Sequence, residues 1–205
     1  MSTRDRMLDA AAHVMRTRGL ARATTKEIAK EAGYSEAALY KHFQDKTALF
    51  LAVLTERMPS GLGPVLADLN RRVGQGSVQE TLDQVARAAL GFYRLGFPMA
   101  ASLFAEPDLL AAHRAALRER DAGPQHVGTA LSAYLAAEQD LGRIRSDADP
   151  EAAAALLLGA CLQHAFLGSF AGESADQSTV DRIGTELVRT LMSGLTPDQA
   201  NSREG

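Results

Sequence analysis

Basic and hydroxyl-bearing side chains gather near the amino end of the chain. All four lysines of the 205 residues fall within 21 consecutive positions: Lys26, Lys30, Lys41 and Lys46. Thr25, Tyr40 and His42 lie in or next to the same window. Ammonium, hydroxyl and imidazole groups donate hydrogen bonds to phosphate oxygens, and such contacts supply much of the affinity of proteins for nucleic acids. The window therefore suits a polyanion-binding surface, although its charge alone would equally suit a solvated helical face.

The charge balance changes along the chain. Residues 1–50 contain nine Lys or Arg against six Asp or Glu, whereas residues 51–205 contain thirteen against nineteen. A basic end on an acidic body is what a polyanion-binding module attached to a domain with another task would need. The net charge of -3 and the 46% of hydrophobic residues exclude a wholly disordered chain.

The elements that must position these side chains are helices. Apolar residues recur with helical spacing along the whole chain and strand-like alternation is scarce, so the expected fold class is all-α. A first helix is expected over 3–18, where Gly19 supplies the stop. Gly or Pro residues interrupt or separate many of the helices expected further along, over 46–58, 65–73, 78–96, 99–105, 107–121, 125–141, 150–171 and 177–194.

Two short helices are expected in the basic window. Thr24 and Glu27 have the spacing of a capping box, which satisfies backbone N–H groups at a helix start. Gly33 adopts a left-handed backbone conformation at low cost and so ends this helix, and Ser35 caps a third helix over 36–42. Two helices of about two turns joined by a tight glycine-containing turn match a helix-turn-helix, whose second helix enters the major groove of DNA.

The residues of this helix-turn-helix are expected to have two different roles, packing and base recognition. Ile28, Leu39 and Phe43 are expected to pack the short helices against their neighbours, because a pair this small cannot bury a core alone. Base edges would be read from the exposed face of the third helix and the start of the second, by Lys26, Glu36, Ala37, Ala38 and Lys41.

The string TTKEIAKEAGYSEAALYKHFQDKTALFLAVL at residues 24–54 resembles the DNA-binding signature of the tetracycline-repressor (TetR) family. Matching positions are Thr25, Ile28, Ala29, Ala32, Gly33, Ser35, Leu39, Tyr40, His42, Phe43, Lys46 and Leu49. The resemblance implies a transcriptional regulator, more often a repressor, with phosphate contacts from Thr25, Tyr40, His42 and Lys46. Ala37 departs from the family pattern, in which glycine is frequent at this position, and Glu36 places a negative charge beside the DNA.

Some of these side chains have a second interpretation. His42 would also suit a hydrogen-bonded core histidine, and Tyr40 would suit simple packing. Glu36 either accepts a hydrogen bond from cytosine N4 or stabilises the positive end of its helix dipole. Lys30 is expected to be solvated only.

The patterns divide the chain into a helix-turn-helix DNA-binding domain at 1–50, a ligand-binding and dimerisation domain at 51–195 and a flexible tail at 196–205. The amino end has no apolar signal region, and the single cysteine, Cys161, excludes an internal disulfide, so the expected location is the cytoplasm. Cys161 is expected to be a small buried hydrophobe rather than a redox group, since no cationic residue lies near it in the sequence.

The last two expected helices suit a subunit interface. The helix over 150–171 is apolar on nearly every side and long enough to span a membrane, but Gln163, His164 and acidic flanks favour burial in protein. The helix over 177–194 carries one apolar stripe. Two copies would form a four-helix interface, as TetR-like proteins do, and such a homodimer would bind a palindromic operator. The expected interface residues are Leu156, Ala160, Gln163, Leu167, Val180, Ile183, Leu187 and Leu191.

The middle helices carry candidates for a ligand pocket, because the resemblance implies a small-molecule effector there. The candidates are Phe92, Tyr93, Phe97, Met99, Phe104, His113, His126, Tyr134 and Phe166. Each of them taken singly also suits an ordinary core position. The sparse charge among them favours an apolar or weakly polar effector.

Two other classes of protein fit the sequence less well. An enzyme is disfavoured, because no metal-spaced histidine pair, glycine-rich phosphate loop or nucleophile set is evident, and neither a metal nor a cofactor is expected. The second alternative is a helical ligand-binding or protein-interaction module whose helix-turn-helix lacks DNA affinity. Steep salt dependence of DNA binding would discriminate against it.

Overall fold

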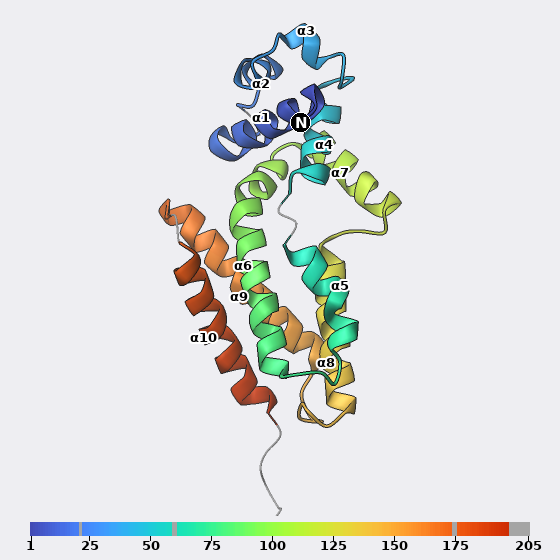
Figure 1. The fold of residues 1–205 in the computed structure, drawn as a ribbon, viewed down its shortest axis with the longest axis vertical. Coiled ribbons are helices and arrows are strands. Elements are labelled where there is room, and N and C mark those ends of the chain that lie inside the picture. The colour runs from blue at the N-terminus through green and yellow to red at the C-terminus, as the bar shows by residue number, and fades with distance from the viewer. Residues whose placement is uncertain (21, 59–60, 174–175, 197–205) are drawn as a thin grey trace, which may run out of the picture. The chain divides into compact units, whose positions relative to one another are not determined.

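The computed structural model describes residues 1–20, 22–58, 61–173 and 176–196, and every regular element in these ranges is a helix (Figure 1). The expected all-α class is therefore confirmed. The chain forms two compact units: the first contains residues 1–60 and 95–123, and the second contains residues 61–94 and 124–205. The predicted functional boundary at residue 50 remains a prediction, and 197–205 of the predicted tail lie outside the described residues.

The first unit packs its helices around one core. It contains α1 (Thr3–Arg18), α2 (Thr25–Ala32), α3 (Glu36–Leu39), α4 (Lys46–Glu56), the last part of α6 (Val78–Leu103) and α7 (Pro107–Glu119). α1 packs against α2 and α4, and α4 packs against α7. Every one of these helices contributes to the core, with buried side chains that include Met15, Ile28, Leu39, Leu49, Met99 and Leu109.

The second unit has a separate core. It contains α5 (Leu62–Arg72), the first part of α6, α8 (Pro124–Asp140), α9 (Pro150–Ala171) and α10 (Gln177–Leu195). α8 packs against α5 and α9, and α10 packs against α9. The core includes Leu82, Leu90, Leu131, Tyr134, Leu157, Cys161 and Val188. Cys161 is fully buried, and burial raises the pKa of its thiol to about 12, so it is the inert hydrophobe that the sequence predicts.

Most helices begin and end close to their predicted positions, because their caps are local. α1 and α9 have the predicted bounds. At the start of α9 the Asp149 carboxylate accepts hydrogen bonds from the N–H groups of Glu151 and Ala152, and Pro150 takes the first helical position. α5 begins at Leu62, three residues before its predicted start at 65.

α6 corrects one prediction. The sequence predicts two helices, 78–96 and 99–105, on either side of Pro98, because a proline inside a helix removes a backbone hydrogen bond. The structure shows one helix, Val78–Leu103, with Pro98 inside it. Met99 and Leu103 after the proline are buried in the core of the first unit, and this packing stabilises the turn that the proline weakens.

α9 packs in its own unit along one side only. Within the described residues it is the helix that is long and apolar enough, by length and composition, to cross a membrane. The sequence predicts that this helix is buried in protein and contributes to a subunit interface; within the single chain 33% of its apolar window is buried, so the rest of that burial stays a prediction. One side of α9 packs in the core of its unit, and the other side leaves leucine and phenylalanine side chains exposed.

Candidate nucleic-acid interface

α2 and α3 form the predicted helix-turn-helix. The capping box is present: Thr24 Oγ1 accepts a hydrogen bond from the Glu27 N–H at 3.2 Å, and the Glu27 carboxylate accepts one from the Thr24 N–H at 3.4 Å. α2 ends at Gly33, whose φ of 78° lies in the left-handed region that favours glycine. Ser35 starts α3, since its Oγ accepts from the Ala38 N–H at 3.2 Å. Local caps and one glycine therefore set the angle between the two helices.

Three apolar side chains hold this pair of helices in place. Ile28, Leu39 and Phe43 are buried in the core of the first unit, together with residues of α1 and α4. They are scaffold residues, as predicted. The polar side chains on the opposite side of the same helices are thereby directed outward.

α3 is shorter than predicted. It covers Glu36–Leu39 rather than 36–42. The N–H groups of Lys41 and His42 bond to carbonyl groups three residues back, at 3.3 and 3.0 Å. Such bonds tighten the end of a helix into a turn. Tyr40, Lys41 and His42 therefore lie in the turn that follows α3.

The nine residues predicted to contact DNA differ in exposure. Six are exposed: Lys26, Ala37, Tyr40, Lys41, His42 and Lys46. Glu36 and Ala38 are partly buried, whereas Thr25 is buried, with 9% exposed. The exposure of His42 disagrees with the alternative of a core histidine.

Thr25 joins the two helices by two hydrogen bonds. Its hydroxyl donates to Glu36 Oε1 at 2.5 Å and accepts from the Tyr40 hydroxyl at 3.3 Å. Thr25 is the first residue of α2, Glu36 is the first of α3, and Tyr40 follows α3. The three side chains thus tie the start of α2 to both ends of α3. No periodic pattern predicts this link, because its partners are 11 and 15 positions apart.

Lys46 is held at the start of α4. Asp45 caps this helix, and its Oδ1 accepts from the Ala48 N–H at 2.7 Å. The Lys46 ammonium lies 5.0 Å from the centroid of the Phe50 ring, one turn further along. This contact orients an exposed cation without removing it from solvent.

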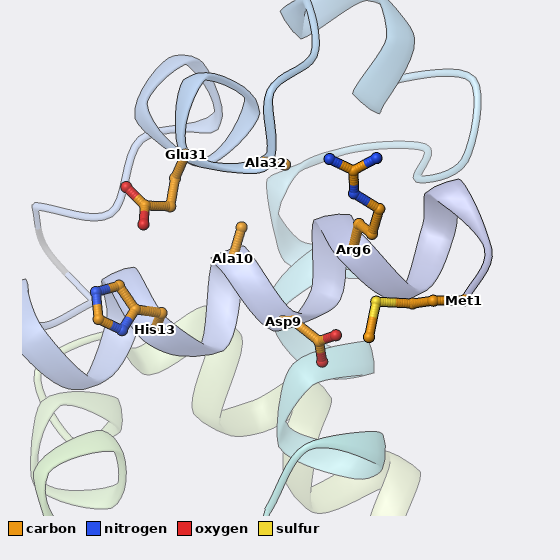
Figure 2. A pocket seen from close by; sticks show the side chains of 7 residues that line it. All are labelled: Met1, Arg6, Asp9, Ala10, His13, Glu31 and Ala32. Carbon is orange, nitrogen blue, oxygen red and sulfur yellow. The ribbon is translucent and has the colours of Figure 1, made fainter.

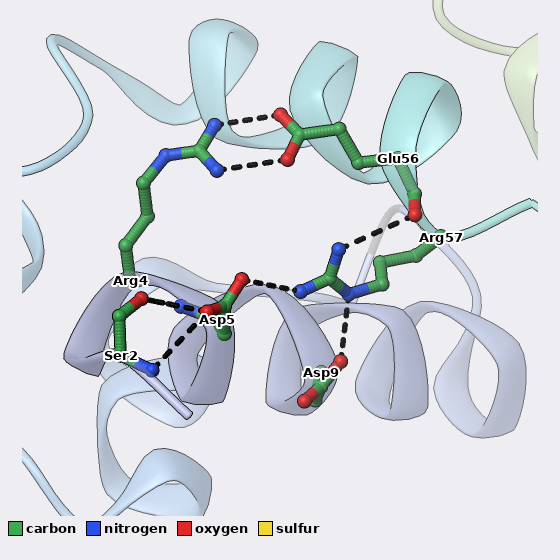
Figure 3. A network of polar contacts seen from close by, with 6 residues as sticks. All are labelled: Ser2, Arg4, Asp5, Asp9, Glu56 and Arg57. Atoms are coloured by element: carbon green, nitrogen blue, oxygen red, sulfur yellow. Dashed lines mark hydrogen bonds and ion pairs between the residues drawn. The ribbon is translucent and has the colours of Figure 1, made fainter.

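A network of charged side chains joins α1 to the end of α4 (Figure 3). Two nitrogens of the Arg4 guanidinium donate to Glu56, at 2.6 and 2.8 Å. Arg57 donates to Asp9 at 2.7 Å and to Asp5 at 3.0 Å. The partners are about 50 positions apart in the chain, so no sequence pattern predicts the network.

An open cavity of 290 Å³ is formed by side chains of α1 and α2 and by the first residue (Figure 2). Its lining residues are Met1, Arg6, Asp9, Ala10, His13, Glu31 and Ala32. Arg6 already donates to the Tyr34 hydroxyl at 3.1 Å, and Asp9 is bound to Arg57. Sites for small effectors are mostly apolar and enclosed, so this polar depression does not match the predicted ligand site, and its lining contains none of the residues predicted for that site.

The nine residues predicted for a ligand pocket are divided between the two units. The first unit contains Phe97, Met99, Phe104 and His113, and the second contains Phe92, Tyr93, His126, Tyr134 and Phe166. Met99 and Tyr134 are fully buried in the cores of their units, as the alternative of a core position predicts. Phe92 and Tyr93 pack edge to face with ring centroids 5.5 Å apart, and Phe104 is exposed.

α9 presents the predicted interface residues at the surface. Leu156, Gln163 and Leu167 are exposed, and Ala160 is partly buried. Phe170, with 84% exposed, continues the same spacing. The sequence prediction does not include Phe170, although its position three residues after Leu167 continues the spacing of the predicted interface residues.

α10 turns the other four predicted interface residues at least partly toward its own unit, and their place in a subunit interface stays a prediction. Val180 is buried, and Ile183, Leu187 and Leu191 are partly buried against the core of their own unit. A Cβ built on Gly184 would lie 3.6 Å from the Cβ of Ala86, so α10 closely approaches α6 along this stripe. A helix with one apolar stripe uses it to attach to its own chain, and the side that α10 turns outward is polar, with Arg182, Thr185, Glu186 and Arg189 exposed.

Comparison with known proteins agrees with this architecture. Residues 7–53 match the family model for bacterial regulatory proteins of the tetR family, and residues 101–193 match the model for the C-terminal domain of AefR-like transcriptional repressors. The transcriptional repressor Rv1474c of Mycobacterium tuberculosis is 33% identical over 168 residues, which cover 75% of this chain and 88% of that protein. The transcriptional regulator YdgC of Bacillus subtilis is 27% identical over 209 aligned positions, which cover 96% of this chain and 94% of that protein.

Solved structures share the fold. A TetR-family transcriptional regulator from Mesorhizobium loti has a TM-score of 0.71 at 20% identity, covering 95% of this chain and 96% of that one. SmeT, the repressor of the Stenotrophomonas maltophilia multidrug efflux pump SmeDEF, has a TM-score of 0.65 at 21% identity in one of its structures, covering 100% of this chain and 99% of that one. These relatives are regulators and not enzymes. The chain belongs to the TetR family of DNA-binding transcriptional regulators.

Proposed function

We propose that this regulator is a repressor that binds a palindromic operator as a homodimer and leaves it when a small molecule binds. The observation that carries the proposal is the exposure of Lys26, Lys41, His42 and Lys46 on a helix-turn-helix whose scaffold residues Ile28, Leu39 and Phe43 are buried. Repressors among the relatives support the direction of regulation. A regulator that acts on DNA in this way would work in the cytoplasm.

The exposed face of α9 supports the homodimer. Leu156, Ala160, Gln163, Leu167 and Phe170 are spaced by four and three residues in alternation, which is the repeat that lets two helices pack along a seam. Leu156 is 66% exposed and Leu167 is 49% exposed within the single chain. An apolar row of this kind is characteristic of a surface that another protein covers. A second copy would cover it symmetrically, with α9 against α9 and the polar side of α10 at the rim.

Two-fold symmetry would give the operator its form. A symmetric dimer presents two copies of α3 to the same face of the duplex, about 34–36 Å apart or a multiple of that distance. Each copy would read one half-site in the opposite direction. A palindrome follows from this geometry.

A small-molecule effector is supported by SmeT, which has been solved in complex with triclosan. In the part of the chain that the structure describes, the buried Nδ1 of His113 on α7 has no hydrogen-bond partner, and burial lowers the pKa of this imidazole. A neutral imidazole in an apolar setting suits a polar group of a mainly apolar ligand. An effector that prefers a form with the wrong spacing of the two α3 helices would weaken DNA binding by its differential affinity.

The test begins with a duplex selected by the purified full-length protein from a randomised pool. Its dissociation constant, measured by fluorescence anisotropy, is expected to rise by about 10³-fold or more between about 50 and 200 mM salt, because several phosphates are neutralised. Lys46→Gln is expected to reduce the slope of log affinity against log salt by about one for each lysine removed.

Lys30→Gln is the matched control, because Lys30 is an exposed lysine of α2 that is predicted to be solvated only. This variant is expected to keep the slope of the wild type. Failure to select any duplex would favour the alternative of a module without DNA affinity. If Lys46→Gln and Lys30→Gln had equal slopes of log affinity against log salt, Lys46 would not contact a DNA phosphate.

A further inference from the structure

The hydroxyl group of Thr25 is directed toward a carboxylate of the same chain, and the hydroxyl group of Tyr40 is directed toward Thr25. Tyr40 donates to Thr25, and Thr25 donates to Glu36 Oε1. A hydroxyl carries one proton and donates one hydrogen bond. In the free protein the proton of Thr25 is therefore not available to a phosphate, although the family resemblance implies a phosphate contact there.

Binding to DNA would change the partners of Glu36. If Thr25 turned its proton to a phosphate oxygen, the Glu36 carboxylate would lose its donor while a polyanion approached. A charged group that loses its hydrogen bond near like charge is costly. The phosphate backbone cannot compensate, because its oxygens only accept.

Some base edges can compensate. In the major groove cytosine presents only a donor, its N4 amino group, whereas guanine presents only acceptors and the N6 donor of adenine lies beside the acceptor N7, which repels a carboxylate. Glu36 is the first residue of α3, and the N-terminal residues of a recognition helix are those that reach base edges. A cytosine placed opposite Glu36 would supply the hydrogen bond that Thr25 withdraws.

We propose that Glu36 is a specificity-determining residue, which competes with DNA phosphate for the Thr25 hydroxyl and releases it where the duplex offers an amino group in the major groove, with cytosine N4 as the preferred donor. The inference rests on the proposed function. Of the two earlier interpretations of Glu36, the inference adopts the contact to cytosine: the carboxylate that accepts from Thr25 in the free protein becomes a base contact at the operator. Non-specific DNA meets the carboxylate without a compensating donor and is bound more weakly.

The test compares Glu36→Gln with the wild type. Glutamine keeps an acceptor for Thr25 but loses the charge, so non-specific binding is expected to strengthen and the contact to cytosine to weaken. The measured quantity is the ratio of the dissociation constants for a scrambled duplex and for the duplex selected by the wild type. We expect Glu36→Gln to lower this ratio by about tenfold, the size of one good base contact.

Glu31→Gln is the matched control, because it removes the same charge from an exposed position of α2. It is expected to strengthen both bindings alike and to leave the ratio within about twofold of the wild type. A general loss of folding would weaken both bindings and would not produce the expected pattern. Thermal denaturation of each variant verifies that it is folded at the assay temperature.

The outcomes separate the two proposals. If the wild type selects no duplex, the proposed function fails. If it selects one and Glu36→Gln has the same ratio as Glu31→Gln, the function stands and the role of Glu36 is wrong. A scan that replaces each cytosine of a half-site by thymine gives a second readout: one replacement is expected to weaken wild-type binding but not Glu36→Gln binding, and equal losses for both proteins would overturn the inference.

Discussion

Asp5 fixes both the start of one helix and the position of another. Its Oδ2 accepts hydrogen bonds from the Ser2 hydroxyl at 2.8 Å and from the Ser2 N–H at 3.1 Å, which completes the capping box of α1. Its Oδ1 accepts from Arg57 at 3.0 Å, at the end of α4. The bond from the Ser2 hydroxyl contributes most to stabilising the ionised carboxylate, and together these bonds lower its pKa from 3.8 to about 2.

This shift predicts the effect of acid. Because the folded-state pKa of Asp5 is depressed, its contribution to stability is present above 3.8 and is lost as pH falls toward about 2. Asp5→Asn is expected to lower the Tm at about pH 6, and its difference from the wild type is expected to shrink below about pH 4. Circular dichroism melts over this range measure the effect. A difference that does not change with pH, or one shared by the exposed control Asp140→Asn, would contradict it.

The residues that act through neighbours distant in the chain are those that sequence patterns could not supply. The exposure of cations such as Lys41 and Lys46 could be predicted, because a charged side chain without an apolar neighbour pattern of its own is solvated wherever the chain turns outward. Thr25 could not, since its burial depends on α3 folding onto α2 and on partners with no periodic relation to it. The same holds for Arg57, whose acceptors on α1 are 48 and 52 positions away.

At the scale of elements, caps determine helix ends and packing determines what each face touches. The start of α9 could be predicted from Asp149 and Pro150 alone, because an N-cap is a contact between near neighbours. The stripe on α10 could be predicted as apolar, but its periodicity does not indicate whether the same chain or a second copy covers it. Pro98 presents the same difficulty, since its tolerance inside α6 depends on the burial of Met99 and Leu103.

Pro98 provides the prediction at this scale. Replacement by alanine restores an N–H group that can bond to the carbonyl four residues back, and α6 already runs through this position. Pro98→Ala is expected to stabilise the protein by up to about 3 kcal/mol in urea denaturation. Pro107→Ala is the control, because a proline at the first position of α7 costs no hydrogen bond and its removal should bring no gain. Equal effects of the two replacements would show that α6 does not bear the strain expected of an interior proline.

At the scale of the whole molecule, the single chain leaves one face of α9 uncovered. This helix buries its inner side in the core of the second unit and leaves Leu156, Leu167 and Phe170 exposed. Leu187 on α10 is a poor position for testing a dimer, because it packs against its own core and a charge there would disturb folding. The exposed leucines of α9 allow association to be tested without that ambiguity.

Leu156→Arg and Leu167→Arg are each expected to yield a folded monomer, because a guanidinium at the seam of a symmetric interface meets its own copy and leaves charge buried without a partner. A monomer engages one half-site at a time, so affinity for the selected duplex is expected to fall by about 100-fold or more as the second contact is lost. Leu141→Arg makes the same change at an exposed leucine after α8 and is expected to leave both properties unchanged. Sedimentation velocity and anisotropy on the three variants measure this. If the α9 variants stay dimeric and keep their affinity for the duplex, the subunits associate through another surface. If the variants become monomeric and still keep this affinity, one subunit is sufficient to bind the operator.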